Sequence, residues 1–439
     1  MHSERLFKWI NVLVLICIVN NIQAQDSVTT WLKNNCNGID MTSQQAFVKT
    51  MQPALNRMAR YNIIGLGEGT HGTSEFQAIR LYISRYLVEE KGYSMICLEN
   101  SFGWCVELNN YLQTGKGNLD TLMRKNMLGM WQNEEMKELL QWMRDYNLKY
   151  PGRLQLVGMD YSETSTVAAI IQQLVHRLQD QALDSMASQL VMYSRMMDDA
   201  YAGFNLPKQA FGWNDVLKNG VSAYELVVAL KEKVQAKLSG KKILSAADTA
   251  LLRTSLLNSE LAFYSLYRPV KEKEEASRDE TMAKMIQQIQ QNKPGAKVLV
   301  WAHNAHIARS AVFPGDNNGG GSGMYLERYF PGQYFAVATT TGDGTMSATT
   351  DRFILNTSAF KSYPLPAAIE NSWENSIAAF TQGAVYLDLS DKKSTVPAKG
   401  LRFTGYGVPG KNDFIPESLP ALFDGLIFIP HTQATHIRQ

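Results

Sequence analysis

Five side chains that can exchange protons or bind a metal lie at or just after the ends of apolar segments. They are Glu68, His71, Glu99, His303 and His306. A histidine titrates near neutrality, so a neutral imidazole can take the proton of a water molecule that attacks a carbonyl carbon. A carboxylate can orient that imidazole, and histidines with carboxylates can also bind a divalent metal ion. These residue types therefore suit hydrolysis by an activated water or metal-dependent hydrolysis.

Four apolar segments, residues 63–66, 93–100, 154–160 and 297–301, predict buried strands that are separated by helical patterns. This alternation predicts an α/β fold with a mainly parallel sheet flanked by helices. The carboxyl ends of parallel strands lie at one edge of the sheet, where such proteins bind their ligands. We therefore expect the five side chains to converge on one site. Asp160 ends the third segment, and we expect it to cap the next helix or to hold the loop.

A glycine-rich loop within residues 65–76 carries Glu68 and His71. Its four glycines are expected to adopt positive φ values and to let the backbone approach a ligand closely. Ser74 and Gln77 have the spacing of a helix capping box. The pattern predicts that a carboxylate and an imidazole are held on a rigid loop between a strand and a helix.

The segment Met1–Gln25 has the order of a signal peptide, with basic residues, then an apolar run, then a small residue at Ala24. The run is short for a bilayer span, so we expect export to the periplasm or the exterior, without stable membrane insertion after cleavage. The α/β domain is expected to comprise residues 26–163 and 276–439. Residues 164–275 show no clear strand and predict a helical insertion that acts as a lid over the site. Its Met and Tyr side chains between residues 192 and 201 either form an apolar wall for a bulky ligand or are simply core.

The overall charge of the 439-residue chain is close to zero. It has 43 Lys and Arg against 41 Asp and Glu, and no polybasic cluster. This balance argues against a nucleic-acid partner and favours a small ligand without strong charge. The three cysteines that follow the signal, Cys36, Cys97 and Cys105, can form one disulfide at most, and the sequence leaves open whether Cys97 and Cys105 pair.

Several short motifs share their order and spacing with one known family. They are Gly67–Phe76 with Arg80, Leu98–Glu99, Gly158–Asp160, Arg278–Asp279 with Met282, and His303–Ala308. From about residue 55 to its end, the chain resembles the erythromycin esterase family. Gly69 stands where that family usually has alanine, which is an exchange of one small residue for another.

The resemblance implies hydrolysis of an ester or lactone, typically the macrolactone of 14-membered macrolide antibiotics, and hence a role in antibiotic resistance. It implies a water molecule activated by His71, with no covalent serine intermediate, no cofactor and no required metal. The expected partner is a small-molecule ester or lactone. Carried over by position, the family's essential residues are Glu68, His71, Arg80, Glu99, His303 and His306.

The four residues around His71 have different expected roles. Glu68 or Glu99 is expected to set the tautomer of His71, as the aspartate of a catalytic triad does. His303 and His306 are expected to position the water or to donate to the oxyanion and the leaving alkoxide.

The arginines have expected roles outside proton transfer. Arg80 is expected to reach back from its helix to orient Glu68 or Glu99, although it could be only a structural ion-pair partner. Arg278 and Asp279 are expected to join the insertion to the sheet, outside the catalytic set.

Three alternatives remain open at this point. In the first, His71, His303, His306 and a glutamate bind a divalent ion, although two histidines three residues apart are not by themselves a zinc signature. In the second, the substrate is another ester of the exported compartment and not an antibiotic. In the third, the chain is an exported binding protein without catalysis. A serine hydrolase is disfavoured because the sequence has no Gly-x-Ser-x-Gly motif.

Overall fold

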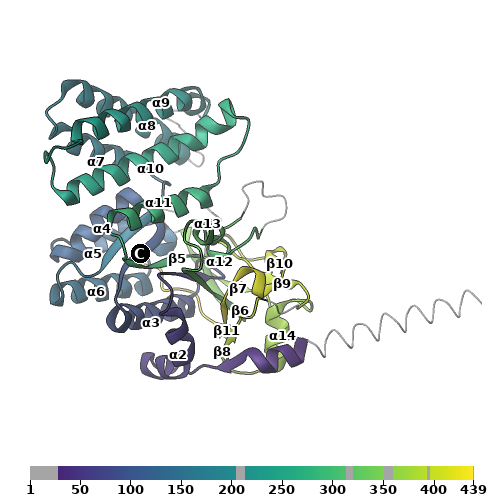
Figure 1. The fold of residues 1–439 in the computed structure, drawn as a ribbon. Helices are drawn as coiled ribbons and strands as arrows, with labels where there is room; N and C mark the ends of the chain where they lie inside the picture. The colour runs from purple at the N-terminus through teal and green to yellow at the C-terminus, as the bar shows by residue number, and fades with distance from the viewer. Residues whose placement is uncertain (1–27, 204–212, 313–319, 351–358, 393–395, 439) are drawn as a thin grey trace, which may run out of the picture.

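A nine-stranded sheet lies at the centre of the fold in the computed structural model, which describes residues 28–203, 213–312, 320–350, 359–392 and 396–438 (Figure 1). The strands are β1 Cys36–Gly38, β2 Ile63–Glu68, β3 Tyr93–Ser101, β4 Gln155–Asp160, β5 Lys297–His303, β6 Tyr334–Ala348, β7 Lys361–Leu365, β8 Val385–Asp388 and β11 Gly425–Thr432. Their order is β1-β8-β11-β6-β2-β5-β3-β4, with β7 paired to β6. β9 Lys399–Arg402 and β10 Phe414–Glu417 form a separate antiparallel pair.

The sheet is mainly parallel, as predicted. The six strands β11, β6, β2, β5, β3 and β4 pair in parallel, whereas β8, β1 and β7 add antiparallel pairs. The prediction of an α/β fold with a mainly parallel sheet flanked by helices is therefore confirmed.

Successive residues of the central strands pack into two different hydrophobic clusters. Cys97 and Val298 belong to one cluster, whereas Ile96 and Leu299 belong to the other. Side chains alternate between the two faces of a strand, so both faces of the sheet are buried. This explains why the strands are continuous apolar runs in the sequence and not polar-apolar alternations.

Helices cover both faces of the sheet. Outside the insertion, the longer helices include α2 Gln44–Met58, α3 Ser74–Lys91, α4 Phe102–Thr114, α5 Leu119–Asn126, α6 Glu134–Lys149, α11 Arg278–Asn292, α13 Ser322–Tyr329 and α14 Trp373–Phe380. The short helices are α12 Asn304–Ile307 and α15 Leu419–Leu422. α2, α3 and α6 pack on one face, and α11, α13 and α14 contribute to the cluster on the other.

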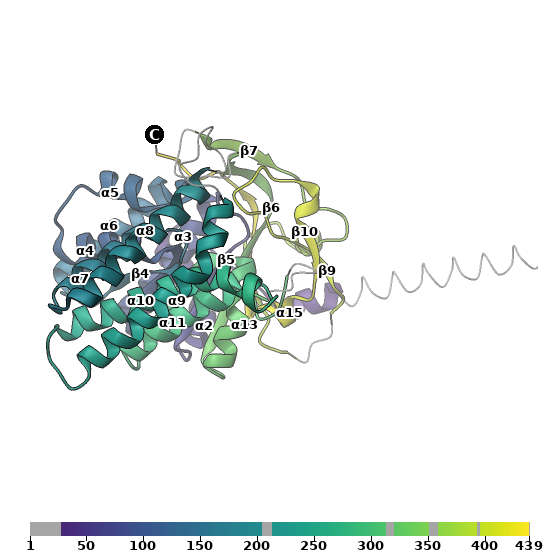
Figure 2. The same cartoon turned by 90° about the horizontal axis from the view of Figure 1, so that it is seen from above.

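Four helices occupy the described part of residues 164–275. They are α7 Ser165–His176, α8 Gln181–Gly203, α9 Trp213–Leu238 and α10 Ala246–Lys271. Figure 1 shows them stacked beyond α4 and α11, and Figure 2 shows them on the opposite side of the molecule from β7, β9 and β10. A lid role for this helical group stays a proposal.

Other predictions concern the amino-terminal segment and the cysteines. The predicted signal peptide, Met1–Gln25, lies outside the described residues. Among the helices that are described, none combines the length and apolar character needed to cross a bilayer. Cys36, Cys97 and Cys105 are unbonded, so Cys97 and Cys105 do not form a disulfide here.

Candidate active site

The predicted side chains converge at the carboxyl ends of β2, β3 and β5. Glu68 ends β2 and is the register partner of His303, which ends β5. Glu99 lies near the end of β3, the neighbour of β5 on its other side. Glu68, His71, Arg80, Glu99 and His303 are all buried. The structure therefore brings five of the six candidate residues into one buried cluster, and His306 joins them from the short helix α12.

Glu68 is the carboxylate that orients His71. Its Oε1 atom lies 2.7 Å from His71 Nδ1. Its Oε2 atom accepts hydrogen bonds from Arg80 Nη2 at 2.6 Å and from Gln77 Nε2 at 3.2 Å. An ionised Glu68 can only accept, so His71 carries its proton on Nδ1 and keeps a lone pair on Nε2. Arg80 thus has the predicted orienting role toward Glu68.

Aromatic side chains surround this group and limit its contact with water. The ring of Trp131 meets the His71 ring edge-on at a centroid separation of 5.5 Å. The guanidinium of Arg80 lies 4.5 Å from the centroid of the Trp301 ring. Burial lowers the pKa of Arg80, and the charges of Glu68 and Glu99 oppose that shift. The ion pair with Glu68 offsets the free-energy cost of burying the guanidinium charge at this position.

The glycines of the loop are required for close approach and not for positive φ, which corrects the prediction. None of the four has a positive φ value. A Cβ atom on Gly72 would lie 1.9 Å from the carbonyl oxygen of Ser347, and one on Gly67 would lie 2.3 Å from Asn304 Oδ1. The loop therefore packs against protein backbone and side chains at distances that exclude any side chain.

Distant segments hold the loop by backbone hydrogen bonds. The carbonyl of Gly72 accepts from the N–H groups of Ser347 and Thr435, and the carbonyl of Gly69 accepts from the N–H of Thr404. Three chain segments far from the loop in sequence thereby restrain the position of His71.

The predicted capping box is wrong. Helix α3 begins at Ser74, and Thr73 is its N-cap residue. The Ser74 hydroxyl donates to Glu135 Oε1 at 2.7 Å, while Gln77 donates to Glu68. Both side chains are used in tertiary contacts, so their spacing reflects the site and not the local start of a helix.

Glu99 belongs to the opposite side of the cluster. Its Oε2 accepts from the backbone N–H of His303 at 3.0 Å, and its Oε1 lies 3.2 Å from both Arg278 Nη2 and His306 Nε2. Burial alone would raise the pKa of Glu99, but His306, His71 and Arg278 outweigh it and hold this pKa well below its usual value. Glu99 is thus an anion, and Glu68, not Glu99, makes the hydrogen bond to His71.

Both ring nitrogens of His303 contact backbone groups. Nδ1 accepts from the N–H of Ala305 at 3.3 Å, and Nε2 faces the carbonyls of Thr404 at 3.2 Å and Gly69 at 3.4 Å. Burial, together with the nearby His71 and His306, lowers the pKa of His303 to about 3. The ring is therefore neutral with its proton on Nε2, and in this arrangement it fastens the loop that carries His71.

His306 has the opposite charge state. Its Nδ1 lies 2.8 Å from Asp279 Oδ1 and its Nε2 lies 3.2 Å from Glu99 Oε1. Burial alone would lower its pKa, but the two carboxylates outweigh burial and raise it to about 10. His306 is consequently an imidazolium at neutral pH that donates to two acids.

The structure adds three residues to the site that the sequence prediction left outside the catalytic set. Arg278 contacts Asp160 through Nη2 at 2.6 Å and through Nε at 3.2 Å, and it also reaches Glu99. Asp279 orients His306 and accepts from both the N–H and the hydroxyl of Ser322. Asp160 therefore binds an arginine of the site and accepts from the N–H of Tyr161 at 2.8 Å, so it holds the loop as one of the two expectations had it and does not cap helix α7. The motif that contains Arg278 and Asp279 was the sequence signal that could have identified them.

The donor set of the cluster disfavours a metal site. Among the residues that the structure describes, no group of three or more His, Cys, Asp or Glu side chains is arranged to hold a metal ion. His303 uses both ring nitrogens for backbone contacts, and the ring of His306 lies between two carboxylates. These histidines lack a nitrogen directed toward a shared ion.

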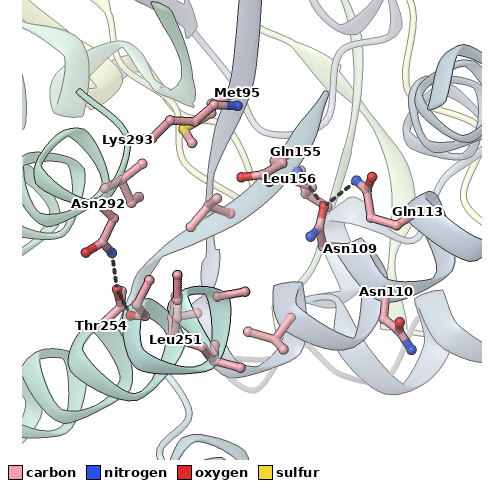
Figure 3. A pocket seen from close by; sticks show the side chains of 17 residues that line it. Met95, Asn109, Asn110, Gln113, Gln155, Leu156, Leu251, Thr254, Asn292 and Lys293 are labelled. Atoms are coloured by element: carbon pink, nitrogen blue, oxygen red, sulfur yellow. Dashed lines mark hydrogen bonds between the residues drawn. The ribbon is translucent and has the colours of Figure 1, made fainter. Parts of the chain in front are cut away.

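A separate pocket of about 620 Å³ lies at the amino ends of β3 and β4, between α4, α10 and α11 (Figure 3). Its walls include Met95, Leu156 and Leu251, and Asn292 donates to Thr254 at one end. None of the six candidate residues lines it. This pocket is therefore distinct from the cluster at the carboxyl ends of the strands.

With this geometry described, comparison with known proteins defines the family. A sequence model of the erythromycin esterase family matches residues 88–432, which is most of the chain. The chain belongs to the erythromycin esterase family, and its class of chemistry is hydrolysis. The matched region contains Glu99, His303 and His306 but begins after Arg80.

Individual relatives are distant. The chain is 24% identical to erythromycin esterase type I of Escherichia coli over 291 residues, which cover 63% of this chain and 69% of that protein. A solved structure described as a succinoglycan biosynthesis protein has a TM-score of 0.74 at 19% identity and covers 95% of this chain and 99% of that one. A mutant of the erythromycin esterase EreC in its open conformation has a TM-score of 0.66 at 18% identity, with 90% and 98% coverage. At these identities the solved structures show the shared fold.

Proposed function

We propose that this protein hydrolyses an ester or macrolactone, with a 14-membered macrolide such as erythromycin as the preferred substrate class. His71 Nε2 is the general base in this proposal. The observation that carries it is the 2.7 Å contact of His71 Nδ1 with Glu68, because this contact leaves the Nε2 lone pair available for water.

The reaction proceeds by direct attack of water. His71 Nε2 removes one proton from the water as its oxygen bonds to the carbonyl carbon, and the carbonyl π electrons move onto oxygen. Collapse of the tetrahedral oxyanion breaks the carbon–oxygen ester bond, and the leaving alkoxide takes the proton from the His71 imidazolium. An acid and an alcohol result, joined as one hydroxy acid when the substrate is a lactone. Glu68 stabilises the imidazolium that forms during this cycle.

A direct test is to incubate the purified protein with erythromycin and, separately, with p-nitrophenyl butyrate. Mass spectrometry should show erythromycin that has gained one water molecule, and the His71→Ala protein should leave it unchanged. Hydrolysis of the simple ester beside intact erythromycin would contradict the macrolide assignment only. Failure to hydrolyse either compound would contradict the proposed activity.

A second candidate substrate is an ester of the exported compartment that is not an antibiotic. The observation in its favour is that one solved structure of similar fold, with a TM-score of 0.74 against 0.66 for the EreC mutant, is described as a succinoglycan biosynthesis protein. One fold can host different substrates, so the panel of esters should include acylated sugars. Loss of activity with EDTA and recovery with added metal would instead support the metal-dependent alternative.

Export and a lid function of α7–α10 are part of the same proposal. The basic-apolar-small order of Met1–Gln25 motivates export, and amino-terminal sequencing of protein from the periplasm or medium should begin near residue 26. An intact amino terminus there would contradict cleavage.

The contact of Asn258 in α10 with the Asp160 carbonyl at 3.2 Å motivates the lid function. Amide exchange in α7–α10 should slow when a product is bound, and unchanged exchange would contradict it.

A further inference from the structure

Arg278 is a charged side chain that the site holds rigidly while leaving it accessible. Asp160 Oδ2 accepts from its Nη2 at 2.6 Å, and Glu99 Oε1 lies 3.2 Å from the same nitrogen. The two acids are almost fully buried, with 1% and 4% of their side chains exposed, whereas 40% of the Arg278 side chain is exposed. Two buried acids therefore fix the guanidinium plane of a side chain that is itself partly exposed.

One nitrogen of this guanidinium lacks an acceptor. Within the described part of the chain, the hydrogen-bonding neighbour of Nη1 is His306 Nε2, at 3.3 Å. His306 is an imidazolium whose Nε2 proton points to Glu99, so it cannot accept from Arg278. Two donors that face each other leave the N–H groups of Nη1 for a third group.

The histidines are less suitable donors to a substrate. His303 uses its Nε2 proton for backbone carbonyls, and His306 directs each of its ring protons to a carboxylate. Either one would have to break a hydrogen bond to contact a developing oxyanion. Arg278 Nη1 would not, and a preorganised donor stabilises a transition state more than one that must reorganise.

We propose that Arg278 is a catalytic residue that donates from Nη1 to the carbonyl oxygen of the substrate and stabilises the tetrahedral oxyanion. This inference rests on the proposed hydrolysis. The negative charge that develops as the carbonyl π electrons move onto oxygen lies against the guanidinium. The proton of the attacking water goes to His71, and Arg278 keeps all its protons. Glu99 lies between the two groups, since it contacts Arg278 and its pKa is lowered by His71 as well as by Arg278.

The test compares Arg278→Ala, Arg278→Gln and Arg278→Lys with the wild-type protein, and uses Arg195→Ala, an exposed arginine on α8, as the matched control. Hydrolysis of p-nitrophenyl butyrate gives kcat and KM for each protein. Binding of the mono-4-nitrophenyl ester of propylphosphonic acid, whose anionic oxygens imitate the tetrahedral intermediate, is measured separately by calorimetry. Added guanidinium, at concentrations that leave the wild-type protein folded, tests chemical rescue.

Arg278→Ala and Arg278→Gln should lower kcat by about 10²–10³-fold with little change in KM, as removal of an oxyanion donor does. Affinity for the phosphonate should fall by a similar factor, and guanidinium should restore part of the activity of Arg278→Ala. The kcat of Arg278→Lys should lie between the kcat of Arg278→Ala and that of the wild type, and Arg195→Ala should have the kcat and the phosphonate affinity of the wild type. Unchanged phosphonate affinity in folded Arg278→Gln would overturn the assignment, as would kcat within a few-fold of wild type. Because phosphonate binding needs no turnover, it separates this result from failure of the hydrolysis proposal.

Discussion

The two sides of the site are held in place by different forces. On the His71 side, formed by Glu68, His71 and Arg80, the side chains are almost completely buried and the loop is fixed by backbone hydrogen bonds and glycine packing. On the His306 side, formed by Arg278, Asp279 and His306, the side chains are partly exposed and are held by ion pairs. The first side is suited to fix the position of a base, and the second is suited to present positive charge.

His303, the N-cap residue of α12, and His306, in the last turn of that helix, differ in a similar way although they are only three residues apart. Burial, together with the nearby His71 and His306, lowers the pKa of His303 to about 3, whereas two carboxylates overcome burial and raise the pKa of His306 to about 10. The same side chain becomes neutral or cationic according to its partners. Histidines at one edge of a sheet therefore need not share one catalytic role.

The largest expected effect concerns the His71 side. Glu68→Gln keeps the size of the side chain but replaces an acceptor with an amide that can donate to His71 Nδ1 and reverse its tautomer. We expect kcat to fall by about 10⁴-fold, the size of the comparable change in a serine protease triad, and steady-state kinetics would measure it. The control is Glu90→Gln, an exposed glutamate on α3. A Glu68→Gln enzyme within tenfold of wild type would contradict the assignment of the base.

A smaller loss is expected from Asp279→Asn on the His306 side. Without this carboxylate the pKa of His306 should fall from about 10, so the ring would lose its proton as pH rises through the range where the wild type stays cationic. We expect kcat to fall by about 10–100-fold, most strongly on the alkaline side. The measurement is the pH profile of kcat from pH 6 to 10.

The matched control for that profile is Asp199→Asn, an exposed aspartate on α8. Its profile should follow that of the wild type. If the profile of Asp279→Asn were parallel to the wild type at every pH, Asp279 would not control the charge of His306.

Gly72→Ala tests whether close packing, and not chain flexibility, fixes the loop. The new Cβ would lie 1.9 Å from the Ser347 carbonyl oxygen, where backbone must move. We expect the free energy of unfolding to fall by about 1–3 kcal/mol, the usual cost of overpacking. Gly383→Ala is the control, because its Cβ would meet no atom closer than 4.0 Å. Equal stability of the two variants in urea titrations would show that the loop adapts.

The smallest expected effect is on how the free energy of unfolding depends on pH in the wild type and in His303→Gln. Because the folded pKa of His303 is lowered from 6.5 to about 3, the unfolded chain binds more protons between these values, and His303 costs stability as pH falls through this window. His303→Gln lacks this loss of stability at low pH. The difference in unfolding free energy between the wild type and His303→Gln should therefore shrink as the pH falls from 7 to 5, by at most about 1.4 kcal/mol per pH unit. Urea unfolding at the two pH values measures it.

His306→Gln should show the opposite trend. The raised pKa of His306 stabilises the folded chain fully below pH 6.5, and this contribution is lost as pH rises toward about 10. The deficit of His306→Gln should therefore shrink between pH 7 and pH 9. The same trend in both variants would refute the distinction between the two histidines.

Sequence reasoning recovered the sheet because each central strand is a continuous apolar run, and it recovered the site because acids and histidines follow those runs. It failed at Ser74, where the spacing of a capping box was found but the hydroxyl instead contacts Glu135. It also failed at the glycines, which are required because distant segments, such as the one with Ser347, pack directly against the loop. It also left Arg278 outside the site. These misses share one cause, since each partner is far away in the sequence and no local pattern encodes it.

The sequence by itself determined the family, the mainly parallel sheet and the meeting of Glu68 and Glu99 at one edge, because apolar periodicity and strand direction are local properties that propagate to the whole sheet. Only the tertiary structure decided which imidazole has a free nitrogen and which carries a charge. The acid that sets the charge of His306, Asp279, is 27 residues before it, and the Thr404 carbonyl that engages His303 is 101 residues after it. A ring's protonation depends on atoms within hydrogen-bond distance, and folding alone brings those atoms there.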